Sequence, residues 1–265
     1  MSNSNRLAIW ILCGLFFSAC ASHSASPPAQ PAIAGPEPSQ TGAAAPNPAP
    51  APPAKDELKE AAAKPAAPFE GEGWHSMFDG ETLTGWRQTA FAGRGEVECR
   101  SGLIVLNMGD PFTGINWTNS FPKMNYEIAL DAMRTMGADF FCGLTVPVGD
   151  SFCSLIVGGW GGSLLGISSL DGMDASENDT TKFVNFESKR WYRIRLRVTQ
   201  GRIEGWVDDK KLIDVGTTGK RIDLRPGDIE MSMPMGIASW QTSSALREIK
   251  CRTVAGPADP PKKEF

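Results

Sequence analysis

Residues 191–208 read WYRIRLRVTQGRIEGWVD, and this stretch decides the fold class. Apolar residues alternate with arginines from Tyr192 to Val198, a period of two that is typical of a strand with one buried and one solvated face. Gln200-Gly201 then forms a two-residue turn, in which the glycine accepts the positive φ that such turns require. The second half alternates in the same way, so the stretch predicts a β-hairpin.

The register of this hairpin follows from the turn. Counting outward from Gln200-Gly201 pairs residues that share the solvated face. The three outward pairs are complementary, two as ion pairs and one as a cation–π contact. A second two-residue turn is predicted at Asp209-Lys210. The predicted pairs are Thr199 with Arg202, Arg197 with Glu204, Arg195 with Trp206, and Arg193 with Asp208.

Further short strands are visible along the chain. Ser101-Gly102 is a predicted two-residue turn, and residues 147–150 form a predicted four-residue turn. Short strands with regularly spaced turns and no long helical period indicate an all-β jelly-roll sandwich. The predicted strands are 96–100, 103–107, 125–134, 140–146, 152–157, 164–168, 236–240 and 246–253.

Two cysteines flank the predicted four-residue turn. That turn places Leu144 opposite Cys153 and Cys142 opposite Leu155, an arrangement with poor geometry for a disulfide. Both cysteines are therefore predicted to stay free thiols or to act as small apolar groups.

The N-terminus has the layout of an exported lipoprotein. Arg6 precedes an apolar run over residues 7–17, which is too short for a comfortable membrane span. Phe17-Ser18-Ala19-Cys20 resembles a bacterial lipobox, in which the cysteine receives a lipid before the signal is cut. Residues 1–19 are thus predicted to be a signal peptide and Cys20 a lipidation site, with an ordinary secretory signal as the alternative. Ala21 favours the outer membrane by the same resemblance, so the predicted location is the cell envelope, facing the periplasm or the surface.

Residues 20–68 are predicted to be a linker. They hold 12 of the 20 prolines and few large apolar residues, so they cannot bury enough surface to offset their ordering entropy. Proline keeps such chains extended, as a semi-rigid spacer. Residues 55–64 are helix-prone, but an isolated helix this short is marginal in water. The folded domain is predicted over residues 69–256, followed by a tail at 257–265.

Charge and histidine content exclude several classes of function. The net charge is −4 with no basic run, which argues against a nucleic-acid partner. His75 is the single histidine in the predicted domain, which excludes a Ser-His-Asp triad and a histidine-based metal site. The cysteines also lack the C-x-x-C spacing typical of zinc ligands.

Residues 77–86, MFDGETLTGW, resemble the motif LFDGKTLxGW that opens the 3-keto-disaccharide hydrolase domain family. The resemblance covers the whole predicted domain, and it implies a concanavalin-like or laminin-G-like sandwich in an exported hydrolase of glycosidic bonds, with 3-keto-disaccharides as the implied substrates. Asp139 stands where the family usually has asparagine, and Asp208-Asp209 where it has Asn-Gly. The other matching pieces are 125–127, 137–144, 191–194, 203–209 and 245–249.

Cleavage of a 3-keto-glycoside through an enolate needs a base for the C2 hydrogen, a group that stabilises the enolate oxygen, and an acid for the leaving group. The most acidic loop, residues 171–179, follows the Gly-rich stretch GGWGG at 158–162. Glycines let a ligand approach the backbone closely, and a tryptophan offers a face on which a sugar can stack. The predicted catalytic residues are Asp171, Asp174, Glu177, Asp139 and Glu127. The predicted substrate-binding residues are Trp160, Trp240, Gln241 and Asn178.

Other interpretations stay open. The acidic loop could be a solvated turn, and Trp160 could pack as part of the core or as a lid. Carboxylates and loop carbonyls could instead hold a structural Ca²⁺, the one cofactor that the sequence suggests. The expected partners are a carbohydrate and, through the N-terminal lipid only, a membrane. The alternative functions are a non-catalytic carbohydrate-binding or adhesion module and a purely structural envelope lipoprotein.

Overall fold

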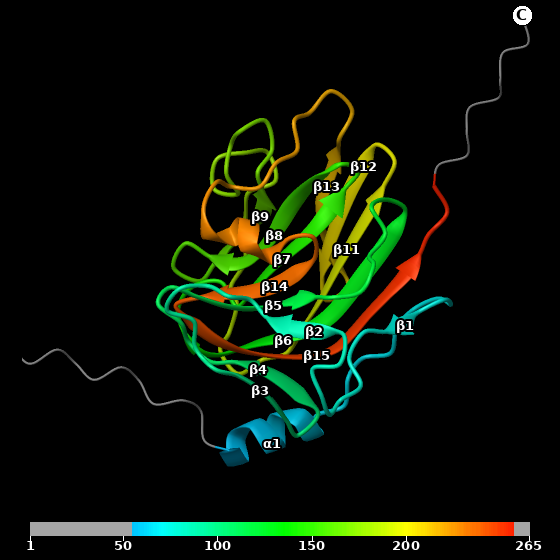
Figure 1. Ribbon diagram of the computed structural model, residues 1–265. Coiled ribbons are helices and arrows are strands. Elements are labelled where there is room, and N and C mark those ends of the chain that lie inside the picture. The colour runs from blue at the N-terminus through cyan, green and yellow to red at the C-terminus, as the bar shows by residue number, and fades with distance from the viewer. Residues whose placement is uncertain (1–54, 257–265) are drawn as a thin grey trace, which may run out of the picture. The chain divides into compact units, whose positions relative to one another are not determined.

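The computed structural model describes residues 55–256, which form two antiparallel sheets packed face to face (Figure 1). The predicted signal peptide, Cys20, most of the linker and the tail at 257–265 lie outside the described residues. The all-β sandwich that the hairpin pattern predicted is confirmed. Among the described residues, no helix is long and apolar enough to span a membrane.

The larger sheet, called sheet A, has eight strands. Its long central strands are β6 and β15, and β1 pairs with the outer part of β15. The order is β13 (Lys210–Gly216), β12 (Arg202–Val207), β11 (Tyr192–Thr199), β6 (Tyr126–Gly137), β15 (Thr242–Thr253), β4 (Leu103–Leu106) and β3 (Val97–Arg100), with β1 (His75–Ser76) off this path.

The second sheet, called sheet B, has seven strands. The order is β10 (Lys182–Phe183), β9 (Leu164–Ser168), β8 (Ser151–Gly159), β7 (Cys142–Val148), β14 (Gly236–Trp240), β5 (Phe112–Trp117) and β2 (Trp86–Gln88). Two short helices accompany the sheets, α1 (Lys55–Ala63) and the 3₁₀ helix η1 (Asp228–Ser232). Figure 1 shows α1 beside β3 and β4, and η1 beside β14 and β7.

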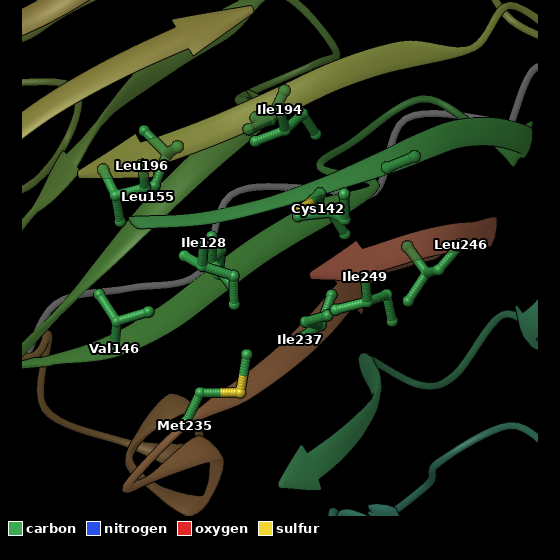
Figure 2. Packing of buried hydrophobic residues seen from close by; sticks show 14 of the residues in the cluster. Ile128, Cys142, Val146, Leu155, Ile194, Leu196, Met235, Ile237, Leu246 and Ile249 are labelled. Atoms are coloured by element: carbon green, nitrogen blue, oxygen red, sulfur yellow. The ribbon is translucent and has the colours of Figure 1, made fainter. Parts of the chain in front are cut away.

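The core lies between the two sheets and explains the alternating pattern of β11. Ile194 and Leu196 are fully buried in one core cluster with Leu155 and Ile237 from sheet B (Figure 2), whereas the arginines that alternate with them along β11 are only half-buried on the other face. Burying one such aliphatic side chain contributes roughly 1.5–3 kcal/mol. Alternate residues of each strand therefore hold the sandwich together and leave the opposite faces available for other contacts.

The predicted register of the first hairpin is confirmed from Thr199–Arg202 to Arg195–Trp206. The guanidinium of Arg195 lies 3.9 Å from the ring centroid of Trp206. Arg193 also lies opposite Asp208, whose backbone N–H donates to the carbonyl of Arg193 at 2.7 Å. The predicted ion pair between their side chains is not formed, because the guanidinium of Arg193 turns to the buried Asp131 of β6 at 2.5 Å.

Two predicted turns were wrong in detail. Val207 pairs with Lys210, so the second turn is Asp208-Asp209. Val148 pairs with Ser151, because Gly149 takes a positive φ and closes a two-residue turn.

The tighter turn at Gly149 shifts the cysteine register by two residues. Cys153 now lies opposite Val146, and Cys142 lies opposite Val157. The two thiols are therefore four strand positions apart, on the order of 13 Å. Both cysteines are buried and free, as predicted. The reason is the four-position separation along the hairpin, which is larger than the separation that the predicted turn implied.

Helix α1 docks on the outer face of sheet A, and this packing was not predicted. Leu58 is 1% exposed and packs with Ala61 against Leu103, Met133 and other residues of that face. The marginal stability expected of an isolated helix is overcome because the sheet buries its apolar side. The packed part of the chain therefore includes α1, ahead of residue 69.

The chain continues from α1 across sheet A as a segment that we call the strap, residues 55–74. Arginines of the sheet donate to its backbone carbonyls: Arg247 to Lys64 at 2.6 Å, Arg193 to Ala67 at 2.8 Å, and Arg252 to Glu70 at 3.1 Å. Two rings of the strap stack on these arginines, Phe69 on Arg193 at 4.0 Å and Trp74 on Arg252 at 4.4 Å, which lowers the cost of desolvating the cations. The solvated face of sheet A is thus partly covered by the protein's own N-terminal segment.

Candidate functional site

The outer face of sheet B carries a cavity of about 530 Å³. The alternation along β14 explains which side chains reach it, because Ile237 points into the core while Ala238 and Trp240 point outward. Its apolar lining is Phe112, Phe140, Ile156, Trp160, Ile229 and Trp240. Its polar lining is Asp139, Ser154, Ser168, Asp174, Arg225 and Asp228.

Small residues on this face let the surrounding loops pack directly on the strands. A Cβ atom at Gly166 of β9 would lie 2.7 Å from the carbonyl oxygen of Ala175, in the acidic loop. A Cβ atom at Gly143 of β7 would lie 2.9 Å from the ring of Phe140. The cavity is therefore walled by loops held against glycines of the sheet.

An aromatic cluster forms one wall of the cavity. The ring of Phe112 meets the ring of Trp240 edge to face, with centroids 4.6 Å apart, and stacks on Phe91 at 4.8 Å. The backbone N–H of Trp240 donates to the carbonyl of Phe140 at 3.1 Å, which fixes the end of β14 against the β6–β7 connection. Interlocked rings of this kind give a rigid apolar surface, the kind on which the apolar face of a sugar stacks.

Asp174 and Arg225 form an ion pair at the cavity. Arg225 Nη1 lies 2.6 Å from Asp174 Oδ2. Asp174 Oδ1 accepts hydrogen bonds from Ser168 Oγ at 2.5 Å and from the backbone N–H of Ala175 at 2.7 Å. Both oxygens of the carboxylate are therefore fixed, and the guanidinium, which has five N–H donors, is held with donors to spare.

Asp139 lies in the connection between β6 and β7. Its Oδ1 accepts from the N–H of Phe140 at 2.7 Å, and its Oδ2 accepts from the N–H of Gly161 at 3.2 Å. Within residues 55–256 it forms no salt bridge. The carboxylate is thus oriented by two backbone groups, with no cation paired to it there.

Trp160 projects from the turn between β8 and β9. It has φ 49° and is 43% exposed, unusual for a large aromatic residue. It lines the main cavity and also an adjoining hollow of about 360 Å³, which it shares with Asp174, Arg225 and Glu177. Trp160 therefore stands at the mouth of the cavity rather than in the core.

The structure brings together four of the predicted residues, Asp139, Trp160, Asp174 and Trp240. Glu177 lines only the adjoining hollow.

The other predicted residues lie elsewhere. Asp171 is exposed, and hydrogen bonds from the backbone N–H of Arg221 and from Lys220 lower the pKa of its carboxyl. The side-chain amide of Asn178 is buried and donates to backbone carbonyls of Ile167 and Asp174, both at 2.8 Å, so it holds the acidic loop from below. Gln241 is exposed and does not line the cavity.

Glu127 lies on the opposite sheet, against the strand-based prediction of a site carboxylate. Its side chain is fully buried on the outer side of sheet A, with Arg195 at 2.8 Å, Arg252 at 2.9 Å and Arg197 at 3.2 Å. Burial by itself raises the pKa of Glu127, but the hydrogen bonds from Arg252 and Arg195 and the charge of Arg197 outweigh burial and lower it. Glu127 therefore anchors an arginine cluster far from the cavity lining.

Sequence reasoning missed the contribution of residues 225–229. Arg225, Asp228 and Ile229 line the cavity from the loop before η1 and from η1 itself. This loop has no strand or helix period, so nothing indicated that it would fold over sheet B. Its one local signal is the turn-forming Pro226-Gly227 between two charged residues.

Metal ligation was also a sequence-based expectation. Within residues 55–256, no group of three or more His, Cys, Asp or Glu side chains is arranged to hold a metal ion. The Ca²⁺ site stays a prediction.

The structure resembles several solved sandwiches. A candidate glycosyl hydrolase from Parabacteroides distasonis aligns with TM-score 0.45 and 17% identity over 76% of this chain and 98% of its own. A carbohydrate-binding module from Bacillus subtilis aligns with TM-score 0.44 and 12% identity over 64% of this chain and 96% of its own. A Bacillus licheniformis β-glucanase aligns with TM-score 0.46 and 10% identity over 71% of this chain and 100% of its own.

The family comparison is stronger than these likenesses. None of the curated proteins matches the chain in sequence. Residues 73–252, which include both sheets except the last residue of β15, match the model of the 3-keto-alpha-glucoside-1,2-lyase-like domain. The family resemblance seen at residues 77–86 is confirmed, and the chain belongs to this carbohydrate-related family.

Proposed function

We propose that the cavity on sheet B binds a 3-keto-glycoside and cleaves its glycosidic bond by elimination across C1 and C2. The observation that carries the proposal is the meeting of Asp139 and the Asp174–Arg225 pair in one cavity with an aromatic wall. These groups supply a base, a cation for an enolate oxygen and a surface for a sugar ring.

The ketone at C3 acidifies the hydrogen on C2, so the C2–H bond is the first to break. Asp139 takes that proton, and the electron pair of the C2–H bond moves into an enolate whose negative charge lies on the C3 oxygen. The enolate then re-forms the C3 ketone, makes the C1–C2 double bond and expels the C1 oxygen. The proton on Asp139 passes to the departing oxygen, so the carboxylate is restored. Addition of water to the double bond afterwards makes the net reaction a hydrolysis.

Asp139 suits the role of base because its hydrogen-bond partners are two backbone N–H groups, and because the nearby Arg134 forms no ion pair with it. A carboxylate already paired with arginine would give up part of that ion pair on accepting a proton. Asp174 therefore suits a different role, which is to hold Arg225 in place. A guanidinium fixed in this way stabilises the enolate oxygen without reorganising during the reaction.

A non-catalytic carbohydrate-binding module is the second candidate. It is favoured by Asp174, whose carboxylate oxygens are all engaged by Ser168, Ala175 and Arg225. In this function the polar groups would fix the sugar, and the rings of Trp160 and Trp240 would supply most of the contact area.

One experiment separates the two candidates. The purified protein is incubated with the 3-keto derivative of an α-linked glucose disaccharide and with the unoxidised parent, each with and without a chelator. Free glucose released from the keto-sugar alone supports elimination, because only that substrate has an acidified C2 hydrogen. Saturable binding of the keto-sugar with no release of glucose contradicts the catalytic proposal and supports the binding module. Loss of release on chelation would support the predicted Ca²⁺.

We also propose that the protein is exported and held in the cell envelope by a lipid on Cys20. The support is sequence-based: the apolar run at 7–17, the small residues before Cys20 and the proline-rich segment that follows.

A further inference from the structure

Arg134 is an arginine buried inside the sandwich near the end of β6, with 5% of its surface exposed. Its guanidinium donates to the carbonyl of Gly162 at 2.8 Å, to that of Gly158 at 3.3 Å and to that of Phe186 at 3.3 Å. It forms no salt bridge among residues 55–256. Burying a cation is costly without compensating interactions. The three carbonyls supply hydrogen bonds, the ring of Phe141 lies 5.2 Å from the guanidinium, and the negative charge of Asp139 also favours the cation.

Two of these carbonyls bracket Trp160. Gly158 and Gly162 lie two residues before and two residues after it, at the ends of the turn between β8 and β9. A single nitrogen of the guanidinium, Nη2, donates to both carbonyls and so draws Gly158, near the end of β8, and Gly162, in the turn that follows, to one point. A Cβ atom at Gly158 would lie 2.6 Å from Arg134 Nη2, and one at Gly162 would lie 3.1 Å from Nη1. The turn is therefore built around the guanidinium.

The conformation of Trp160 depends on this closure. A large residue with φ 49° is strained, and such a residue persists only where its surroundings determine it. The side chain is 43% exposed, so the backbone of the turn has to hold this conformation. The same turn also presents the N–H of Gly161 to Asp139 Oδ2.

We propose that Arg134 is a positioning residue: by clamping Gly158 and Gly162 it fixes Trp160 at the cavity mouth and aims the N–H of Gly161 at Asp139. The sugar platform and the carboxylate are thereby set by one buried cation that touches neither the ligand nor the reacting atoms. Only the identity of the ligand, a sugar, rests on the proposed function. The placement of Trp160 can be measured with no ligand present.

The test of placement uses fluorine NMR of the full-length protein labelled with fluorotryptophan. The Trp160 resonance is assigned by its loss in Trp160→Phe, and one sharp line is expected for the wild type. Arg134→Lys keeps the charge, but its side chain is shorter and has one nitrogen, so it cannot hold the carbonyls of Gly158 and Gly162 together with that of Phe186, and the line should broaden or split. An unchanged line in a folded Arg134→Lys protein would overturn the proposal.

A second variant disturbs the clamp from the turn. Gly162→Ala places its Cβ against the guanidinium and against the carbonyl of Ala138, whereas a Cβ at Gly161 meets nothing within 4 Å. Both glycines have positive φ, 105° and 81°, so Gly161→Ala is the matched control for backbone strain. The Trp160 line should broaden in Gly162→Ala and stay sharp in Gly161→Ala. Equal effects of the two alanines would overturn the proposal even if Arg134→Lys fails to fold.

Ligand binding gives an independent readout through a double-mutant cycle with the 3-keto disaccharide. Arg134→Lys should raise KM by about five- to tenfold, the scale of losing one aromatic contact, with a smaller effect on kcat. In a Trp160→Ala background the same substitution should add nothing to KM, because the two residues act through one contact. A full effect in that background would overturn the proposal. If the wild type turns over no keto-sugar, the proposed function fails while the NMR result still decides the role of Arg134.

Discussion

Arg225 reaches Asp174 across 2.6 Å, although the two residues are 51 positions apart in the chain. This ion pair joins the acidic loop to the loop that precedes η1, and both loops then frame the cavity on sheet B. The pair has no counterpart in any local pattern, yet it brings the one arginine of the cavity lining to the place where an enolate oxygen would form.

Substituting Arg225 should reduce catalysis and leave stability nearly unchanged. Arg225→Met is expected to lower kcat by about 10²–10³, the usual cost of removing one donor to a developing oxyanion. The side chain is 61% exposed, so loss of the ion pair should change the unfolding free energy by less than about 1 kcal/mol. Steady-state kinetics and denaturant unfolding measure the two effects. Arg221→Met, which removes another exposed ion pair in the same segment, is the control.

Asp139→Asn should abolish most of the turnover, because the amide cannot accept the C2 proton. The expected loss in kcat is about 10²–10⁴, measured as glucose release from the 3-keto disaccharide. The matched control is Asp171→Asn, an exposed aspartate of the acidic loop that lies outside the cavity lining. If Asp139→Asn retains full activity while Arg225→Met loses it, the base is another carboxylate, and Asp228 is the next to test.

Glu127 should make stability depend on pH. Its pKa is lowered in the folded protein, so the group stabilises the fold at pH values above its ordinary pKa, and this stabilisation is lost as the pH falls through the lowered folded value. Urea unfolding at neutral and acidic pH should show a larger loss in the wild type than in Glu127→Gln. At neutral pH the variant should be destabilised by about 3–5 kcal/mol, because three arginines lose a buried partner. If the unfolding free energies of the wild type and Glu127→Gln fall equally between neutral and acidic pH, Glu127 does not have this role.

The thiols of Cys142 and Cys153 should be unreactive in the native protein. Burial raises the pKa of each to about 12, so almost no thiolate exists near pH 8. Titration with an aromatic disulfide reagent should modify them only after denaturation. The half-buried Cys99 and Cys251 supply the comparison, since partial burial raises their pKa values less completely. Fast labelling of all four thiols in the folded state would contradict the buried register.

Cys20→Ala should release the protein from membranes while leaving the folded domain intact. The lipid would be attached through the thiol, and without it the proposed anchor is lost. Fractionation of cells into membrane and soluble parts, with mass spectrometry of the mature N-terminus, measures the result. A variant that stays in the membrane after its signal is cut would exclude lipidation at this cysteine.

Strand periodicity predicted most of sheet A, and it did so for a physical reason. In β11 every second residue is a large apolar side chain in the core, so burial alone fixes which face points inward. The strand β5, Phe112–Trp117, was not predicted because Gly114 and Asn116 interrupt the pattern. Those two residues lie on the cavity side, where loops pack closely on the sheet. The same small side chains that make room for the site therefore weaken the signal by which the strand would be found.

The site itself was only half predictable. The acidic loop and the Gly-rich turn gave Asp174 and Trp160, because carboxylates and glycines near an aromatic residue are a local signal. Glu127 has the same chemical type, but its neighbours are three arginines from two other strands, β11 and β15, which no local pattern reveals. Long-range pairing thus decided which carboxylates line a cavity and which stabilise the sandwich.

The strap and the cavity lie on opposite outer faces of the sandwich. The strap fixes α1 and the chain that follows to the outer side of sheet A, whereas the cavity opens on the outer side of sheet B. A chain held by its N-terminus is therefore attached on the side of sheet A, and its cavity faces away from the point of attachment. The arginines of sheet A settle where the attachment begins, on the face of the domain opposite to the cavity. An immobilised protein captured by its N-terminus would present the cavity to large, insoluble glycans as readily as to small soluble sugars.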